Sequence, residues 1–213
     1  MQGAPDATAL LSYGAIFTLF FITLGPLKIL GPFAQLTRET DEATMQRIAV
    51  RAFVLAVIAV VAGGFAGRVL LENWGISASA MLLAGGIIFA LVGLRLVLEQ
   101  YQPAHPVPPP LPGEPIAAAM RITFPTVVTP YGIAALIVVL TNSRDAERTG
   151  TILALLLAVM VLNLLTMLYG RRIMDGVTVI ALQVIGAVLG VLQVAIATDM
   201  ILRALSALGL LHE

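Results

Sequence analysis

The sequence predicts an all-α, polytopic integral membrane protein with six transmembrane helices, arranged as two inverted three-helix repeats with broken first and fourth helices. Apolar residues make up 59% of its 213 residues and charged residues only 11%, and the mean hydropathy is +0.99. A soluble domain carries about 25% charged residues. The chain therefore lacks the polar surface that it would need in water. Two prolines at matching places in the two halves predict the breaks.

Six apolar segments are long enough to cross the bilayer as helices, which takes about 20 residues. They cover residues 9–36, 48–71, 76–98, 119–141, 151–170 and 177–202. The first eight residues contain no Lys or Arg and so lack the charged region of a cleavable signal peptide. We therefore expect the first span to be retained.

A proline-rich stretch separates the third span from the fourth and is expected to be an exposed, extended linker. It divides the chain into a first three-helix repeat at residues 1–99, a linker at 100–118 and a second three-helix repeat at 119–213. Because three spans per repeat is an odd number, the second repeat must enter from the opposite face of the membrane. The alternative is a six-helix bundle without internal symmetry.

The matched prolines interrupt the first and fourth spans. Pro130 follows Pro26 by 104 positions (130 − 26). The same shift relates Ile29 to Ile133, Leu36 to Leu140 and Thr37 to Thr141. A proline removes an amide donor and disrupts the helix before it, and hydrocarbon tolerates the freed carbonyl only beside protein or a water-filled cavity. Broken spans at equivalent places of two repeats indicate the central binding site of a transporter.

Seven residues at or near these breaks and one residue of the fifth span are the candidate substrate-binding residues: Gly25, Pro26, Lys28, Thr129, Pro130, Tyr131, Gly132 and, in the fifth span, Asn163. Lys28 is the only lysine and follows Pro26 closely. One interpretation places it in a cavity, where it meets a substrate carboxylate. The other lets its ammonium group reach back to the membrane interface.

The other polar residues of the spans have a functional and a structural interpretation. Asn163 lies near the middle of its span and is the best candidate for a cavity residue, although such amides also hold helices together by hydrogen bonds. The pairs Arg95–Glu99 and Asp199–Arg203 have helical i,i+4 spacing and are expected to be interfacial ion pairs.

Composition also excludes several functions. Lys and Arg together number 12, as do Asp and Glu, so no basic excess indicates nucleic-acid binding. The absence of cysteine excludes thiol catalysis and cysteine-bound metal. No acidic pair, metal-ligand spacing or phosphate-binding loop occurs in the spans. We therefore expect no enzyme and no cofactor beyond coupling to H+ or Na+. The expected partners are a small-molecule substrate and membrane lipid.

The distribution of arginines in short loops predicts the orientation. One face carries Arg38, Arg47, Arg51, Arg95, Arg121, Arg171 and Arg172, and the other carries Arg68, Arg144, Arg148 and Arg203. Since positive residues accumulate on the cytoplasmic side, both termini are predicted to lie outside.

Three short motifs carry a resemblance to a known family. They are Phe33-x-x-Leu36-Thr37, the run from Gly75-Ile76-Ser77 to Ala84-Gly85-Gly86-Ile87-Ile88, and Phe124-Pro125-Thr126-Val127-Val128-Thr129-Pro130-Tyr131-Gly132-Ile133. Their order and spacing, from about Leu10 to Leu205, resemble the MarC family of bacterial inner-membrane proteins. The resemblance implies six spans, a place in the bacterial inner membrane and transport of a small neutral amino acid such as glycine, alanine or threonine. Gly25, Lys28 and Ile29 depart from the family pattern.

The sequence therefore favours a secondary transporter that moves a small neutral amino acid by alternating access. The rival hypothesis is a non-transporting structural or regulatory membrane protein, whose proline kinks only shape the bundle. A transporter predicts that both breaks lie within about one helix diameter, roughly 10–12 Å, beside a polar cavity. A scaffold predicts kinks that face lipid or are separated by dry packing.

Overall fold

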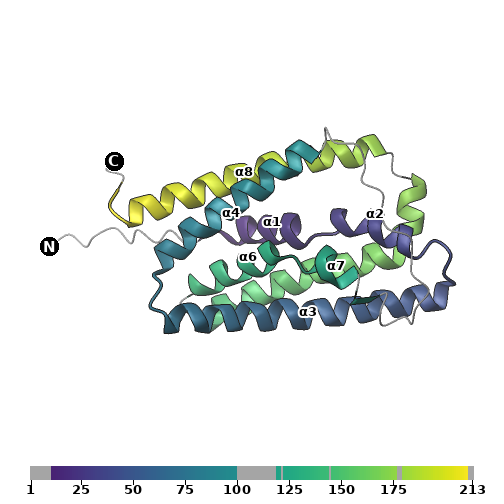
Figure 1. Cartoon of the computed structure of the whole chain (residues 1–213), viewed down its shortest axis with the longest axis horizontal. Helices are drawn as coiled ribbons and strands as arrows, with labels where there is room; N and C mark the ends of the chain where they lie inside the picture. Colours follow the sequence, from purple (N-terminus) through teal and green to yellow (C-terminus); the bar gives the residue numbers. More distant parts are fainter. Residues whose placement is uncertain (1–10, 100–118, 121, 144, 177–178, 211–213) are drawn as a thin grey trace.

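The computed structural model describes residues 11–99, 119–120, 122–143, 145–176 and 179–210. Within these ranges the chain is all-helical, as predicted, and contains no strand (Figure 1). In chain order the elements are α1 (Tyr13–Leu24), α2 (Leu27–Leu36), α3 (Glu42–Asn73), α4 (Ala78–Glu99), the short segment η1 (Thr123–Val127), α6 (Pro130–Thr141), α7 (Ala146–Gly176) and α8 (Val179–Ala207). Segment η1 is kinked, because Phe124 within it is extended (φ −120°, ψ 125°). The predicted linker at 100–118 lies outside the described residues.

Five helical segments of the described chain are long and apolar enough to cross a membrane. They are Tyr13–Leu36, which combines α1 and α2, Glu42–Asn73, Ala78–Leu98, Ala146–Gly170 and Val184–Ala207. The predicted span at 119–141 differs, because its continuous α-helix, α6, has only 12 residues. The protein is thus a polytopic integral membrane protein whose fourth predicted span is interrupted.

Helix α3 begins before the apolar segment that predicted it. The carboxylate of Asp41 accepts a hydrogen bond from the main-chain N–H of Thr44, at 2.9 Å, and so caps the helix. This hydrogen bond to the carboxylate lowers the pKa of Asp41. The helix therefore includes a polar first turn that hydropathy alone does not assign to it.

The first break separates α1 from α2 at the predicted proline. Gly25 has an extended conformation (φ −80°, ψ 174°), and Pro26 precedes the first turn of α2. A Cβ on Gly25 would overlap the main-chain carbonyl oxygen of Phe21. The close approach of these two main-chain segments therefore requires glycine.

The second break lies between η1 and α6. Val128 and Thr129 are extended (ψ 101° and 149°), and Pro130 begins α6. Proline suits this position because the first helical residue needs no N–H for the helix and benefits from a fixed φ. The prediction that the first and fourth helices are broken is therefore confirmed at both prolines.

Packing connects the two halves of the chain. Helices α1 and α2 pack mainly on α7, and α6 packs mainly on α3, while η1 contacts α2 and α3 equally. Helices α4 and α8 lie along each other, and they contact α6 and α1, respectively. In Figure 1, α6 runs opposite to α1 and α2, α7 opposite to α3, and α8 opposite to α4. Most helix contacts thus cross the boundary between residues 1–99 and 119–213.

The core lies between the broken helices and their neighbours. Its largest buried side chains include Phe20, Phe33 and Phe89. Large apolar side chains also cover the outside, where Ile58 and Val191 are 60% and 61% exposed. An apolar exterior of this kind suits contact with lipid.

Candidate functional site

The two helix breaks meet in the interior. The side chain of Leu24, at the end of α1, occupies the space where a Cβ on Gly132 would lie. The hydroxyl of Thr129 donates a hydrogen bond to the main-chain carbonyl oxygen of Thr23, at 3.4 Å. Neither break faces lipid alone, because each supplies atoms that contact the other.

Main-chain groups that the breaks release find specific side-chain partners. Asn163 of α7, which is 1% exposed, donates a hydrogen bond from Nδ2 to the carbonyl oxygen of Leu24 at 2.5 Å. Thr129 caps α6 by accepting a hydrogen bond from the N–H of Gly132 at 3.1 Å. Helix α2 differs, because Pro26 offers no side-chain cap to its first turn. Its N-terminal end therefore keeps a partial positive charge.

One buried acceptor near the first break is unpaired. Asn163 Oδ1 is enclosed and has no hydrogen-bond partner within the part of the chain that the structure describes. Buried polar atoms normally have partners, and those that do not are candidates for binding a ligand, an ion or water. The amide of Asn163 therefore holds the break with its nitrogen and offers its oxygen to a donor.

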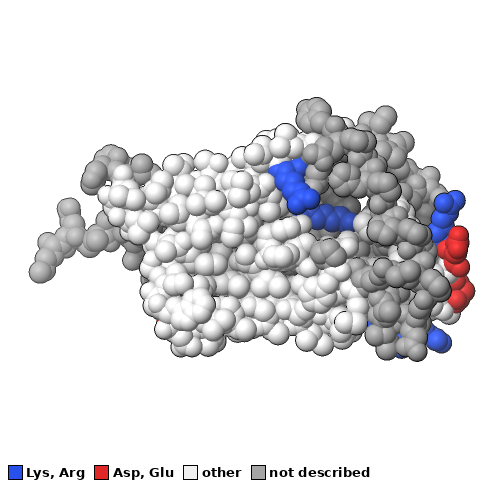
Figure 2. Space-filling view, viewed as in Figure 1, with Lys and Arg blue, Asp and Glu red and all other residues white. Residues whose placement is uncertain are grey.

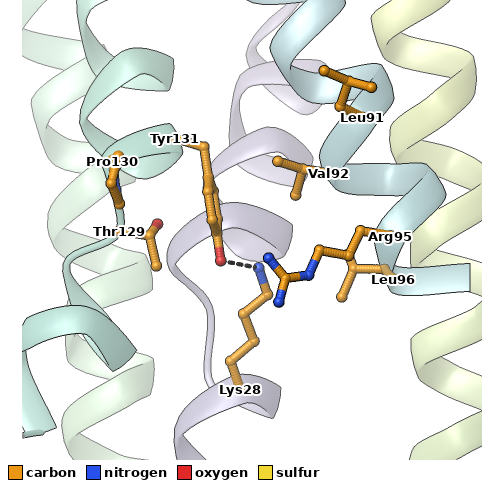
Figure 3. Close-up of a pocket in the computed structure, with 8 residues that line it drawn as sticks. All are labelled: Lys28, Leu91, Val92, Arg95, Leu96, Thr129, Pro130 and Tyr131. Carbon is orange, nitrogen blue, oxygen red and sulfur yellow. Dashed lines mark hydrogen bonds between the residues drawn. The ribbon is translucent and has the colours of Figure 1, made fainter. Parts of the chain in front are cut away.

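A cavity of about 760 Å³ lies beside the breaks. Its described lining comes from α2, α4, α6 and the residue before α6, and consists of Lys28, Leu91, Val92, Arg95, Leu96, Thr129, Pro130 and Tyr131 (Figure 3). Figure 2 shows basic groups at a hollow, next to a broad surface of uncharged side chains, with other charged groups at the right-hand edge of the view. A cavity of this size can enclose a small organic solute.

Lys28 is turned toward the second break. Its Nζ donates a hydrogen bond to the phenol oxygen of Tyr131 at 3.0 Å, and the same nitrogen lies 4.5 Å from the centre of the Tyr131 ring (Figure 3). A hydrogen bond and a cation–π contact both stabilise an ammonium group that is partly removed from solvent. In this structure the lysine lines the cavity.

Arg95 of α4 is the second cation of the cavity. Figure 3 shows its guanidinium group reaching toward the ammonium group of Lys28. The sequence placed Arg95 in an interfacial pair with Glu99, whose side chain lies outside the described residues. The pair Asp199–Arg203 is confirmed as an ion pair, with 2.6 Å between Oδ2 and Nε.

The structure separates the predicted residues into two groups. Lys28, Thr129, Pro130 and Tyr131 line the cavity. Gly25, Pro26 and Gly132 belong to the breaks, and Asn163 of α7 bonds to the first of them, but none of the four belongs to the described lining. Sequence reasoning missed the contribution of α4, namely Leu91, Val92, Arg95 and Leu96. The one usable signal was the charge of Arg95 inside an apolar segment.

The cavity is suited to an anionic group. Both charged side chains of its described lining are cations, and no acidic side chain belongs to that lining. Across the described residues no cluster of His, Asp or Glu can hold a metal ion. The described lining offers hydrogen bonding and charge pairing.

Comparisons with known proteins agree with this architecture. The sequence profile described as MarC family integral membrane protein matches residues 10–208. A UPF0056 membrane protein from Methanocaldococcus jannaschii is 25% identical over 198 residues, which cover 89% of this chain and 93% of that protein. No solved structure matches the chain.

Proposed function

The chain belongs to the MarC family of integral membrane proteins, and we propose that it is a secondary transporter of a small neutral amino acid. One observation carries this proposal. Two helix breaks from different halves of the chain contact each other beside a cavity that contains the only lysine. Broken helices that converge on a polar cavity are the arrangement in which many secondary transporters bind substrate.

The cavity and the first helix break together offer complementary groups for the two ends of a zwitterion. Lys28 and the uncapped N-terminal end of α2 provide positive charge for a carboxylate. The unpaired Oδ1 of Asn163 lies at the C-terminal end of α1, where helix carbonyls carry partial negative charge. An ammonium group, or a coupling H+ or Na+, is favoured at that end. The proposed substrate is thus a glycine-, alanine- or threonine-like amino acid.

The helix directions support alternating access. Each helix of the first half has a counterpart of opposite direction in the second half, as inverted repeats require (Figure 1). Each broken helix packs on the long second helix of the other half, α7 or α3. Rocking one half would therefore move the broken helix of the other and change which side the cavity faces.

We place the protein in the bacterial inner membrane with both termini outside. The larger number of arginines on the opposite face, seven against four, supports this orientation. The absence of cysteine makes the orientation simple to measure. A single cysteine at Ser12, at the start of α1, should react with a membrane-impermeant thiol reagent in intact cells.

A structural or regulatory role is the second candidate. It is favoured by the hydrogen bonds that Asn163 and Thr129 already make to carbonyl groups of the first break. A purely structural kink also needs such bonds, whereas it has no need of a lysine turned into a cavity.

Uptake by reconstituted protein tests the proposal. Purified protein in proteoliposomes should accumulate labelled glycine, alanine, serine or threonine when a pH or sodium gradient is applied. Collapse of the effective gradient should abolish accumulation. Folded protein that transports none of the four under either gradient would contradict the amino-acid assignment.

A further inference from the structure

We propose that Lys28 and Arg95 together bind one carboxylate group, which makes carboxylate recognition the main determinant of what enters the cavity. This inference rests on the proposed function, which makes the bound carboxylate part of a substrate. It concerns binding alone, so it can be tested without measuring transport. It gives Arg95, a residue of α4, a direct contact with substrate.

The geometry brings the two cations to one place from different helices. Lys28 lies in the first turn of α2 and Arg95 near the end of α4, and both line the cavity. In Figure 3 the guanidinium group of Arg95 and the ammonium group of Lys28 point to the same place, beside the hydroxyl of Tyr131. Their donors therefore converge on a common volume.

The negative charge of a carboxylate is attracted by both cations, and hydrogen bonds between charged groups are stronger than those between neutral groups. A carboxylate has two oxygen atoms and can accept hydrogen bonds from both cations at once. The guanidinium fork of arginine matches a carboxylate in shape and can donate two parallel hydrogen bonds. A neutral hydroxyl or amide lacks the charge that strengthens both contacts.

Tyr131 shows where an oxygen ligand of Lys28 can lie. Its phenol oxygen accepts the hydrogen bond from Lys28 Nζ at 3.0 Å. A substrate carboxylate oxygen would make the same kind of contact with another of the three ammonium donors. The ring beneath the ammonium group then keeps the lysine in the cavity with substrate bound.

The apolar part of the lining restricts the substituent that a bound carboxylate can carry. Leu91, Val92 and Leu96 form the α4 side of the cavity next to Arg95. A short apolar substituent can lie against these side chains without leaving a polar group unsatisfied. The site therefore favours small carboxylates with an aliphatic substituent.

Three matched small molecules distinguish binding of the carboxylate group of alanine from binding of its ammonium group. Alanine, propionate and ethylamine share a short aliphatic chain and differ in which charged groups they carry. We expect alanine and propionate to bind to the purified full-length protein in detergent, measured by calorimetry at fixed pH and salt. Ethylamine should not bind detectably at the same concentrations. Ethylamine binding as tight as that of propionate would overturn the inference.

Variants of Arg95 directly test its contribution to carboxylate binding. Arg95→Gln should weaken propionate binding by about tenfold or more, since it removes a charge-assisted contact. Arg95→Lys should give an intermediate loss, because it keeps the charge without the planar fork. Arg68→Gln is the matched control, because Arg68 pairs with Glu72 on α3 at 2.7 Å and does not line the cavity. Its propionate binding should equal that of the wild type.

The failures of the two proposals are distinguishable. If Arg95→Gln, with unchanged thermal unfolding, binds propionate as tightly as the wild type, the inference is wrong even where uptake is observed. If propionate binding depends on Arg95 but proteoliposomes transport no amino acid, the inference stands and the transport proposal fails. Should Arg95→Gln fail to fold, Arg95→Lys carries the test, and wild-type affinity in that variant counts against a bidentate contact.

Discussion

The side-chain amide of Asn163 donates a hydrogen bond to the carbonyl oxygen of Leu24, the residue at which α1 ends. These residues are 139 positions apart, in different halves of the chain. A long helix of one half thus satisfies the main-chain break of the other. The break is stable because this partner is built into the opposite half.

Asn163→Leu should destabilise the protein by about 1–3 kcal/mol, because a buried carbonyl group loses its donor. Thermal unfolding of the purified protein in detergent measures the change. Thr166→Val is the control one turn away, since its hydroxyl bonds only to the carbonyl oxygen of Leu162 in its own helix, at 2.8 Å. Equal losses in both variants would show that the contact with α1 has no special weight.

Alanine substitutions at three glycines of the broken helices should differ in a defined order. Gly132→Ala should cost about 1–3 kcal/mol, because the Leu24 side chain must move. Gly25→Ala should cost more, since the atom that its Cβ overlaps belongs to the main chain. Gly31→Ala meets open space and should be neutral or stabilising by up to about 1 kcal/mol. Any other order in unfolding temperature contradicts the proposed close packing at the breaks.

The stability of the protein should depend on the hydroxyl group of Thr129 and not on its methyl group. Thr129→Val removes both the cap of α6 and the bond to Thr23, and should cost about 1–2 kcal/mol. Thr129→Ser keeps the hydroxyl and should stay close to wild type in stability and uptake. Thr141→Val provides the comparison, because that hydroxyl bonds within α6 at 2.8 Å.

Lys28 and Tyr131 should affect substrate affinity to different extents. Lys28→Gln should raise the dissociation constant by about tenfold or more, because the ammonium is proposed to contact the carboxylate. Tyr131→Phe keeps the ring beneath the ammonium and loses the 3.0 Å hydrogen bond, so its effect should be smaller. Calorimetry with alanine measures both. Unchanged affinity in Lys28→Gln would remove the lysine from the binding site.

Labelling of single-cysteine variants should reveal whether the cavity contains water. The natural chain has none, so labelling has no background. Val92→Cys, in the cavity lining, should react with a hydrophilic thiol reagent and be protected by substrate. Leu157→Cys lies on the outer surface of α7, where the residue is 48% exposed, and should react poorly because it faces lipid. Slow labelling at both positions would indicate a dry cavity.

Much of the fold is predictable from the sequence because the properties that determine it are local. A continuous apolar run predicts a membrane helix wherever it occurs, and prolines at matching places of the two halves favour breaks there. A proline alone does not decide a break, because Pro32 lies inside α2. The breaks at Pro26 and Pro130 were therefore foreseeable. The start of α3 was not, because a cap at Asp41 depends on one side chain outside the apolar pattern.

The sequence by itself determined the helical membrane fold and the two places where its helices break. Only the tertiary structure decided that Arg95 shares a cavity with Lys28, and that Asn163 meets Leu24. The reason is physical: hydropathy reports that a helix lies in lipid, but nearly uniform apolar helices carry little information about which face turns inward. That rotation depends on how side chains from distant parts of the chain pack together.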